Sequence, residues 1–322
     1  MTKDALLALL TAREGEFVSG AELARTLRLS RTAVWKAAAS LRAEGYPLES
    51  LPKRGYRLAP GGDVLSRENV ARFLRHKELR LEVYPAVTST NTLLKARAEQ
   101  GEAAGLALIA AAQTQGRGRM GRSFYSPPDS GLYLSLLLRP TAPAGEAVRM
   151  TACAAVAVAE AIETLSGRET QIKWVNDVLV DGRKVCGILT EAALDCESGT
   201  LHYLVVGIGV NTAVPAGDFP EELRGIAGAA FPEKLPQLRS RLAAEILDRL
   251  LDYSADPGGE ACFAAYEKRS LVLGRAVNLL LPGREPQPAE AIALERDYAL
   301  RVRLPDGSEK TVNSGEVSLR LI

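Results

Sequence analysis

The hydrophobic and polar positions of the first sixty residues follow first the period of α-helices and then that of β-strands. Apolar residues recur every three to four positions in residues 3–12, 21–27 and 31–43, which predicts three helices. Two short strands are expected within residues 46–58, on either side of a turn at residues 52–55. This order is typical of a winged helix-turn-helix domain, in which the last helix enters the DNA major groove.

The residues of this domain that would face DNA are polar or basic. The first sixty residues hold ten Lys or Arg and six Asp or Glu, whereas the whole chain has a net charge of +1. The basic residues gather on the outward face of the third helix and at the hairpin tip, where they can reach bases and phosphates. The predicted DNA-binding residues are Arg31, Thr32, Trp35, Lys36, Lys53 and Arg54. The pattern also fits a three-helix interaction module that binds no DNA.

Residues 65–270 alternate helical and strand patterns, but hairpins join their central strands. Asp181-Gly182 is a two-residue hairpin signal between strands at residues 178–180 and 184–190, and a third strand is expected at residues 201–210. Such an antiparallel meander argues against a doubly wound parallel sheet. Helices are predicted near residues 91–100, 145–165, 235–253 and 261–269.

The last fifty residues consist of short runs with the alternation of β-strands, and the hairpin turn Pro305-Asp306-Gly307 separates two of them. These runs predict a small SH3-like β-barrel. The whole chain is therefore predicted to be α+β. Its expected domains are a winged helix-turn-helix domain (residues 1–60), a mixed or antiparallel sheet with helices (residues 65–270) and the β-barrel (residues 271–322). Pro60-Gly61-Gly62 is the expected linker between the first two domains.

Composition narrows the class of protein. The four cysteines form no Cys-x-x-Cys pair, which is typical of reduced thiols, and two histidines are too few for a histidine metal cluster. The alanine-rich stretch at residues 151–165 contains Glu160 and Glu163 and is too short to span a bilayer. We therefore expect a cytoplasmic protein without a membrane-spanning segment.

The loop at residues 116–122 carries the strongest chemical signal, because it holds three glycines and three arginines. Glycine lets the backbone approach an anion closely, and arginine pairs with phosphate or carboxylate oxygens. The spacing Gly-x-Gly-x-x-Gly also matches a dinucleotide fingerprint, but Pro127 and Pro128 follow where that fingerprint needs a helix. The loop is predicted to clamp a nucleotide; the alternative is a solvated basic loop without a ligand.

Polar residues at strand ends are the other candidates for a site. Lys173 ends an apolar strand, where burial is costly unless an anion pairs with it. A substrate carboxylate or phosphate would supply that anion; the alternative is an edge lysine paired with a surface acid. Asn176, Asp177 and Asn211 also lie at strand ends and can face one cleft. The Ser89-Thr90-Asn91 run follows a predicted strand and can cap a helix, offer ligand contacts, or do both.

Taken together, the chain resembles the bifunctional biotin–protein ligases that also act as biotin operon repressors, over essentially its whole length. The motifs that carry the resemblance are Ser30-Arg-Thr-Ala-Val-Trp-Lys36, Ser89-Thr-Asn91, Gly116-Arg-Gly-Arg-Met-Gly-Arg122, Lys173-Trp-Val-Asn-Asp177, Gly182-Arg-Lys-Val-Cys-Gly-Ile-Leu189 and Gly207-Ile-Gly-Val-Asn211. In that family, biotin and ATP form biotinyl-5'-AMP, and a lysine of a biotin carboxyl carrier protein then takes the biotin. The resemblance implies a class II synthetase-like central sheet, operator DNA as a partner and a homodimer promoted by the adenylate.

The resemblance also assigns residues. Biotin-binding residues would be Ser89, Thr90, Asn91, Gln113, Arg117, Gly118, Arg119 and Lys173, and adenylate-binding residues would be Arg119, Arg122, Phe124, Asn176 and Asn211. Lys173 and Arg119 would be catalytic, and Asp177 is a candidate ligand for the Mg²⁺ that accompanies ATP. Val175 stands where the family motif usually has proline, and Phe124 where it has tryptophan. A lipoate- or octanoate-handling relative and a non-catalytic metabolite-sensing transcription factor remain as alternatives.

Overall fold

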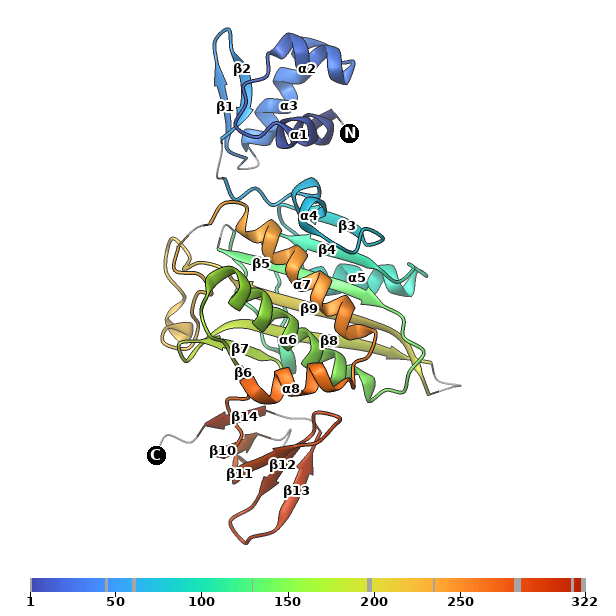
Figure 1. Cartoon of the computed structure of the whole chain (residues 1–322), viewed down its shortest axis with the longest axis vertical. Coiled ribbons are helices and arrows are strands. Elements are labelled where there is room, and N and C mark those ends of the chain that lie inside the picture. Colours follow the sequence, from blue (N-terminus) through green and yellow to red (C-terminus); the bar gives the residue numbers. More distant parts are fainter. Residues whose placement is uncertain are drawn as a thin grey trace. The chain divides into compact units, whose positions relative to one another are not determined.

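The structure is a computed structural model that describes residues 2–43, 46–59, 62–128, 130–195, 199–233, 235–280, 285–313 and 316–319 (Figure 1). The chain divides into two units. The first contains Met1–Leu74 together with Glu233–Arg241, and the second contains Arg75–Pro232 together with Leu242–Ile322. Each unit is described below by itself.

The first unit begins with the predicted winged helix-turn-helix domain. Its helices are α1 (Thr2–Ala12), α2 (Gly20–Leu27) and α3 (Arg31–Ala43), and its wing is the antiparallel pair β1 (Leu48–Leu51) and β2 (Gly55–Leu58). Ser19 and Ser30 cap α2 and α3, because their hydroxyls accept the backbone N–H groups of Glu22 and Ala33, both at 3.1 Å. Leu6, Leu23 and Leu41 are fully buried between the helices. The sequence prediction for this domain is confirmed.

The rest of the first unit contains one helix that the pattern did not predict, α4 (Arg67–Phe73), which Ser66 caps. A segment from late in the chain joins it here. Arg239 donates its backbone N–H and its Nε to the Asp63 carboxylate, at 2.8 and 2.7 Å. Of the predicted linker, residues 60 and 61 lie outside the described residues, whereas the Gly62 carbonyl accepts the N–H of Gln237 at 3.2 Å.

The second unit is built on a seven-stranded sheet with the order β3-β4-β5-β9-β8-β7-β6. The strands are β3 (Arg80–Tyr84), β4 (Leu106–Ala110), β5 (Gly131–Leu138), β6 (Gln171–Lys173), β7 (Asp177–Val180), β8 (Arg183–Leu194) and β9 (Leu201–Asn211). Only β3 and β4 are parallel within this described sheet, and every other pair is antiparallel. Asp181 and Gly182 have positive φ angles of 50° and 72°, as the predicted hairpin requires. The mixed sheet is confirmed.

Helices cover both faces of this sheet (Figure 1). They are α5 (Thr90–Glu99), α6 (Glu146–Ser166), α7 (Leu238–Ser254) and α8 (Glu260–Arg269). On one face, Leu94 of α5 packs against Leu108 and Leu137 of the sheet. On the other face, α6 packs on β8 and β9, and α8 packs on α6. The alanines in the middle of α6 are fully buried and allow it to lie close to the strands.

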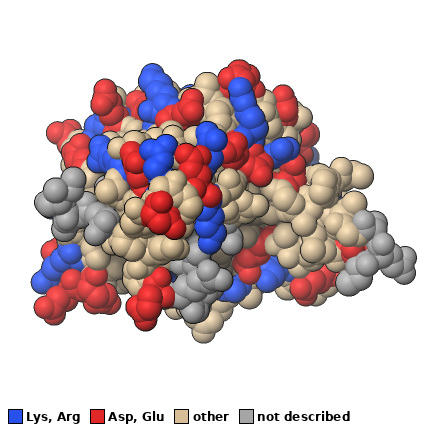
Figure 2. Space-filling view, turned by 90° about the horizontal axis from the view of Figure 1, so that it is seen from below, with Lys and Arg blue, Asp and Glu red and all other residues tan. Residues whose placement is uncertain are grey.

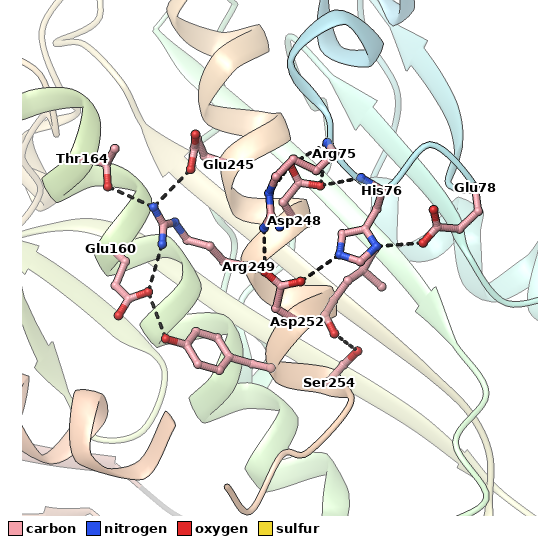
Figure 3. A network of polar contacts seen from close by, with 12 residues as sticks. Arg75, His76, Glu78, Glu160, Thr164, Glu245, Asp248, Arg249, Asp252 and Ser254 are labelled. Carbon is pink, nitrogen blue, oxygen red and sulfur yellow. Dashed lines mark hydrogen bonds and ion pairs between the residues drawn. The ribbon is translucent and has the colours of Figure 1, made fainter. Parts of the chain in front are cut away.

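A polar network joins the segment before β3 to α7 (Figure 3). Asp248 is buried, and its carboxylate accepts the backbone N–H groups of Arg75 and His76 at 2.8 and 3.0 Å. The His76 ring bonds to Asp252 at 2.9 Å and to Glu78 at 2.8 Å. These two carboxylates raise the pKa of His76, Asp252 having the larger effect. His76 is thus a structural residue of this network.

The C-terminal part of the second unit is all-β. Its strands are β10 (Arg275–Leu280), β11 (Gln287–Leu294), β12 (Leu300–Arg303), β13 (Glu309–Val312) and β14 (Glu316–Leu319), in an antiparallel sheet with the order β13-β12-β11-β10-β14. The strands expected near residues 276–281, 289–294, 299–304, 310–312 and 317–321 correspond to β10–β14, although residues 281, 320 and 321 lie outside the described residues. On the face shown in Figure 2, acidic and basic side chains lie next to one another, and the residues drawn in colour form no large area of one sign.

Candidate active site and DNA-binding face

A cavity lies against β8 and β9, where the start of α5 and the loop at residues 116–122 converge. The predicted residues that line it are Ser89, Thr90, Asn91, Gln113, Arg117, Gly118, Arg119, Phe124 and Asn176. The other lining residues are Lys184, Gly187, Ile188, Leu189, Gly207, Ile208 and Gly209. The fold thus brings five of the six sequence motifs onto one surface.

Uncharged polar groups in the cavity wall hold one another in place. The Gln113 side-chain oxygen accepts the backbone N–H of Thr90 at 2.9 Å. Asn91 Nδ2 donates to the carbonyl of Leu189 at 3.0 Å. Ser135 Oγ, from β5, lies 2.6 Å from Asn91 Oδ1 and 2.7 Å from Thr90 Oγ1. Because each amide is oriented by a partner, the wall presents fixed donors and acceptors to a ligand.

Two glycines of β9 make room for side chains from other elements. A Cβ on Gly207 would lie 2.0 Å from Asn91 Oδ1, and a Cβ on Gly209 would lie 2.6 Å from a ring carbon of Phe124. Both distances are collisions, so the close approach of Asn91 and Phe124 to the strand backbone requires glycine. Ser89 is likewise used twice, since it lines the cavity and its Oγ accepts the N–H of Thr92, at 3.4 Å, as the cap of α5.

A carboxylate that the motifs did not identify anchors the arginine loop. Glu191, on β8, accepts Arg117 Nη1 at 3.1 Å, Lys95 Nζ at 2.8 Å and Asn91 Nδ2 at 3.0 Å. Burial raises the pKa of Glu191, but the hydrogen bonds from Lys95 and Asn91 and the nearby positive charges outweigh burial and lower it below its usual value. Its signal in the sequence is the single acid of β8, which stands within the mostly apolar residues 185–194.

A second contact holds the same loop to the sheet. Arg119 Nη1 donates to Asn176 Oδ1 at 2.7 Å, and Asn176 Nδ2 donates to the Ile188 carbonyl at 3.1 Å. Asn176 is buried. The guanidinium of Arg119 is therefore positioned in the cavity by a side chain that is itself fixed to β8.

The predicted DNA-binding residues lie in the first unit and differ from the cavity residues in their exposure. All six are exposed: Arg31, Thr32, Trp35, Lys36, Lys53 and Arg54. Trp35 is 60% exposed, which is rare for so large an apolar side chain. Arg54 stacks on the ring of Phe17 with its guanidinium carbon 4.4 Å from the ring centroid. The recognition helix and the wing tip therefore present polar and aromatic groups to solvent.

Comparisons with known proteins agree with the separation of an N-terminal helix-turn-helix domain from the domain that holds the cavity. The profile of the Biotin/lipoate A/B protein ligase family matches residues 83–211, an HTH domain profile matches residues 2–57, and the profile of the Biotin protein ligase C terminal domain matches residues 272–320. The Bifunctional ligase/repressor BirA of Escherichia coli is 30% identical over 319 residues, which cover 98% of this chain and 96% of that protein. This chain belongs to the biotin protein ligase family.

Other members of the biotin protein ligase family support the assignment. The Bifunctional ligase/repressor BirA of Bacillus spizizenii is 38% identical over 224 residues, covering 69% of this chain and 68% of that protein. The structure of a biotin protein ligase from Aquifex aeolicus in complex with biotin and ATP covers 75% of this chain and 98% of its own, with 27% identity and a TM-score of 0.59. The predicted family and fold class are confirmed, and the comparisons favour neither the lipoate relative nor the non-catalytic sensor.

The lysine that lines the cavity of this biotin protein ligase is Lys184. The sequence motifs assigned no role to this residue. Its Nζ lies 2.7 Å from Asp177 Oδ1. Lys173 is half-buried, does not line the cavity, and its ammonium contacts no acceptor among the described residues. Lys173 lies on β6 and Lys184 on β8, the two strands that flank β7, so the spacing of the motifs alone could not say which one faces the cavity.

Two further predicted residues lie outside the lining of the cavity. Arg122 is exposed at the end of the loop. Asn211 is half-buried at the end of β9, where its carbonyl accepts the N–H of Ala230 at 2.8 Å. Their roles toward the adenylate stay predictions.

The ligase offers limited means of holding a metal by itself. In the described part of the chain, no group of three or more His, Cys, Asp or Glu side chains is placed to bind an ion. Mg²⁺ usually needs only one or two carboxylates, because water and nucleotide phosphates complete its shell. Asp177, half-buried beside the cavity, fits that limited role. None of the described helices combines the length and apolar character that crossing a bilayer requires.

Proposed function

We propose that this chain joins biotin to ATP and then to a carrier protein, and that its winged helix represses transcription. The biotin carboxylate attacks the α-phosphate of ATP, which forms biotinyl-5'-AMP and releases pyrophosphate. The ε-amine of a carrier-domain lysine then attacks the mixed anhydride, forming an amide and releasing AMP. The observation that best supports this reaction is a cavity wall in which oriented amides and hydroxyls stand beside Arg117, Arg119 and Lys184.

The uncharged residues suit the biotin head group. Its ureido ring has both donors and acceptors, and the wall offers matching groups on Ser89, Thr90, Asn91 and Gln113. These residues are buried or half-buried, so each unmade hydrogen bond with a wrong ligand carries a desolvation cost. Phe124 adds an aromatic face beside the glycines of β9, where an adenine ring can stack.

The cationic residues suit the reacting phosphate. Negative charge builds on the α-phosphate oxygens during attack, and fixed cations stabilise it without reorganising. Arg119, held by Asn176, and Lys184, held by Asp177, are placed for this task. The resemblance gave this role to Lys173, and that assignment stays a prediction. Mg²⁺, held by Asp177 and the phosphates, would supply further charge neutralisation.

The direct test is ATP–pyrophosphate exchange by the purified full chain. We expect exchange when biotin is added and none when lipoate replaces it. Incubation with a biotin carboxyl carrier domain should then increase the mass of the carrier by about 226 Da. This is the mass of biotin less the water that is lost when the amide forms. Exchange that is independent of biotin, or that lipoate supports equally well, would contradict the proposal.

The repressor role rests on the exposed basic face and on the two ligase/repressor relatives. One winged helix makes few phosphate contacts, whereas two linked heads gain avidity of roughly a hundredfold or more. We therefore propose that biotinyl-5'-AMP promotes a homodimer that binds a two-fold symmetric operator. Sedimentation with and without the adenylate, together with titration of duplexes selected from a random pool, tests this. If the adenylate changes neither the assembly state nor the DNA affinity, the repressor part of the proposal is wrong.

A further inference from the structure

Residues 174–177, from the end of β6 to the first residue of β7, include Asn176 and Asp177, which hold the cavity cations Arg119 and Lys184. They also include two buried side chains that do not line the cavity. Trp174 is 3% exposed and Val175 is 5% exposed. A tryptophan buried directly beside catalytic groups has one polar atom, the indole Nε1–H, which must find an acceptor. Its acceptor identifies what supports this segment.

The acceptor belongs to the C-terminal domain. Trp174 Nε1 donates to the backbone carbonyl of Tyr298 at 2.8 Å. Two residues earlier, the Ile172 carbonyl accepts the N–H of Leu271 at 2.8 Å, where the chain leaves α8 for the C-terminal sheet. The segment that leads into the Asn176–Asp177 turn is therefore bonded once to the start of the C-terminal domain and once to a turn within it.

The Tyr298 carbonyl is itself firmly held. Tyr298 lies in the turn between β11 and β12 with a φ angle of 63°, and hydrogen bonds between Glu295 and Tyr298 (2.8 Å) and between Glu295 and Ala299 (2.9 Å) close that turn. Its ring is fully buried and packs against Tyr266 and Phe263 of α8, with centroids 5.2 and 5.6 Å apart. A carbonyl fixed in this way can hold the side chain of Trp174 in one position.

Tyr266 brings α8 close to the same charged groups. Its hydroxyl is buried and has no hydrogen-bond partner among the described residues. Burial raises the pKa of Tyr266, the negative charge of Asp177 raises it further, and the positive charge of Arg119 opposes both. The pair of aromatic rings formed by Tyr266 and Tyr298 thus lies within electrostatic reach of the residues that position the cavity cations.

We propose that Trp174 is a positioning residue for the ligase reaction: its hydrogen bond to the Tyr298 carbonyl makes the C-terminal domain a support for the Asn176–Asp177 turn. Through that turn the support extends to Arg119 and Lys184. The biotin head-group residues are held by other contacts, chiefly those of Gln113 and Ser135. This inference rests on the proposed function, and it predicts that loss of the bond impairs the use of ATP more than the binding of biotin.

The test uses the full chain with Trp35 replaced by phenylalanine, so that Trp174 is the only remaining tryptophan. In this background, Trp174 is replaced by 3-benzothienyl-alanine, which keeps the ring shape but has sulfur in place of the N–H, and separately by phenylalanine. Tyr203→Phe is the matched control, because it also removes one buried donor, the hydroxyl 3.3 Å from Glu99. We expect kcat/KM for ATP in pyrophosphate exchange to fall by about ten- to a hundredfold in both Trp174 variants, since small misplacements of catalytic groups have effects of this size.

Three readouts separate positioning from general packing. The KM for biotin should change less than twofold, the thermal midpoint of the benzothienyl variant should stay near that of its parent, and the control should retain its ATP kinetics. Tyr298→Gly, which permits the positive φ angle but removes the ring, should reproduce the loss and shift the Trp174 emission to longer wavelength. Unchanged ATP kinetics in the benzothienyl variant, or equal losses for ATP and biotin, would overturn the proposal.

Failure of the proposed function gives a different result. If the parent chain shows no biotin-dependent exchange, the ligase assignment itself is wrong. Exchange in the parent with unaltered ATP kinetics in every Trp174 and Tyr298 variant retains the ligase and rejects only the positioning role.

Discussion

The cavity and the exposed basic face of the winged helix-turn-helix domain are both proposed to bind phosphates, but their cations are held in opposite ways. In the cavity, Arg117 and Lys184 are paired with Glu191 and Asp177, and Arg119 is fixed by Asn176. On the recognition helix, Arg31 and Lys36 are exposed, and their side chains contact no acid among the described residues. The difference follows from the task. A duplex is a polyanion that brings its own charge to solvated side chains, whereas a transient charge in a reaction needs cations whose positions are already set.

The pairing in the cavity also has a consequence for selectivity. A phosphate that enters must compete with Glu191 and Asp177 for the same cations. Only a ligand whose other groups satisfy the amides of the wall gains enough to replace these contacts. On the DNA face no acid among the described residues pairs with Arg31 or Lys36, so binding there should depend on salt and be less selective without base contacts.

The largest expected effect distinguishes the two lysines near the cavity. Lys184→Met should lower biotin-dependent pyrophosphate exchange by about a hundredfold or more, because it removes a preorganised cation from the reacting phosphate. Lys173→Met should have a smaller effect, since Lys173 does not line the cavity. A greater loss in the Lys173 variant would restore the assignment that the family resemblance gave and would contradict the cavity geometry.

Glu191→Gln should have the next largest effect, because it weakens the anchor of the arginine loop and leaves Lys95 without the half-buried carboxylate that pairs with it. Loss of these charged contacts should cost about 1–2 kcal/mol, which corresponds to a roughly five- to thirtyfold weaker biotin affinity. Amide exchange in residues 116–122 should also become faster than in the parent. Unchanged exchange in this loop would show that Arg117 and Glu191 do not restrain it.

On the DNA face, Lys36→Ala should weaken binding to any duplex several-fold and reduce the salt slope by about 1, as expected for one phosphate contact. Pyrophosphate exchange should stay at the parental rate, because Lys36 belongs to the other unit. Titrations at several salt concentrations provide the measurement. A steep loss for one sequence with an unchanged salt slope would instead assign Lys36 to base recognition.

The smallest expected effect is on the pH dependence of thermal stability. It involves neither the cavity nor the DNA-binding face and therefore serves as a reference for both. The pKa of His76 is raised by Asp252 and Glu78, so its charged form stabilises the fold. This contribution is complete below the unfolded value of about 6.5 and is lost as pH rises through the raised pKa. The thermal midpoint should therefore decline slightly over that window, and His76→Gln should remove this part of the decline. An equal decline in the variant would place the titrating group elsewhere.

Local signals in the sequence predicted most of the fold. Ser89 caps α5, as the Ser89-Thr90-Asn91 run predicted, and Asp181-Gly182 forms the hairpin that its residue types require. These features depend on a few neighbouring residues, which is why they can be read without a structure. α4 was missed because its seven residues give too short a pattern to stand out from a connecting segment.

The residues that form the site were predicted less completely, because their positions depend on contacts with residues distant in the chain. The sequence by itself determined the family, the order of the elements and the motifs that converge on the cavity. Only the tertiary structure showed that Glu191 anchors the loop and that Lys184 faces the cavity. The pairing of β7 with β8 shifts register between Val178 and Leu179, so that Lys184 lies opposite Leu179 and Cys186 opposite Val178. Such a bulge changes the face that the following side chains take, and it is set by packing across strands rather than by the residues of one strand.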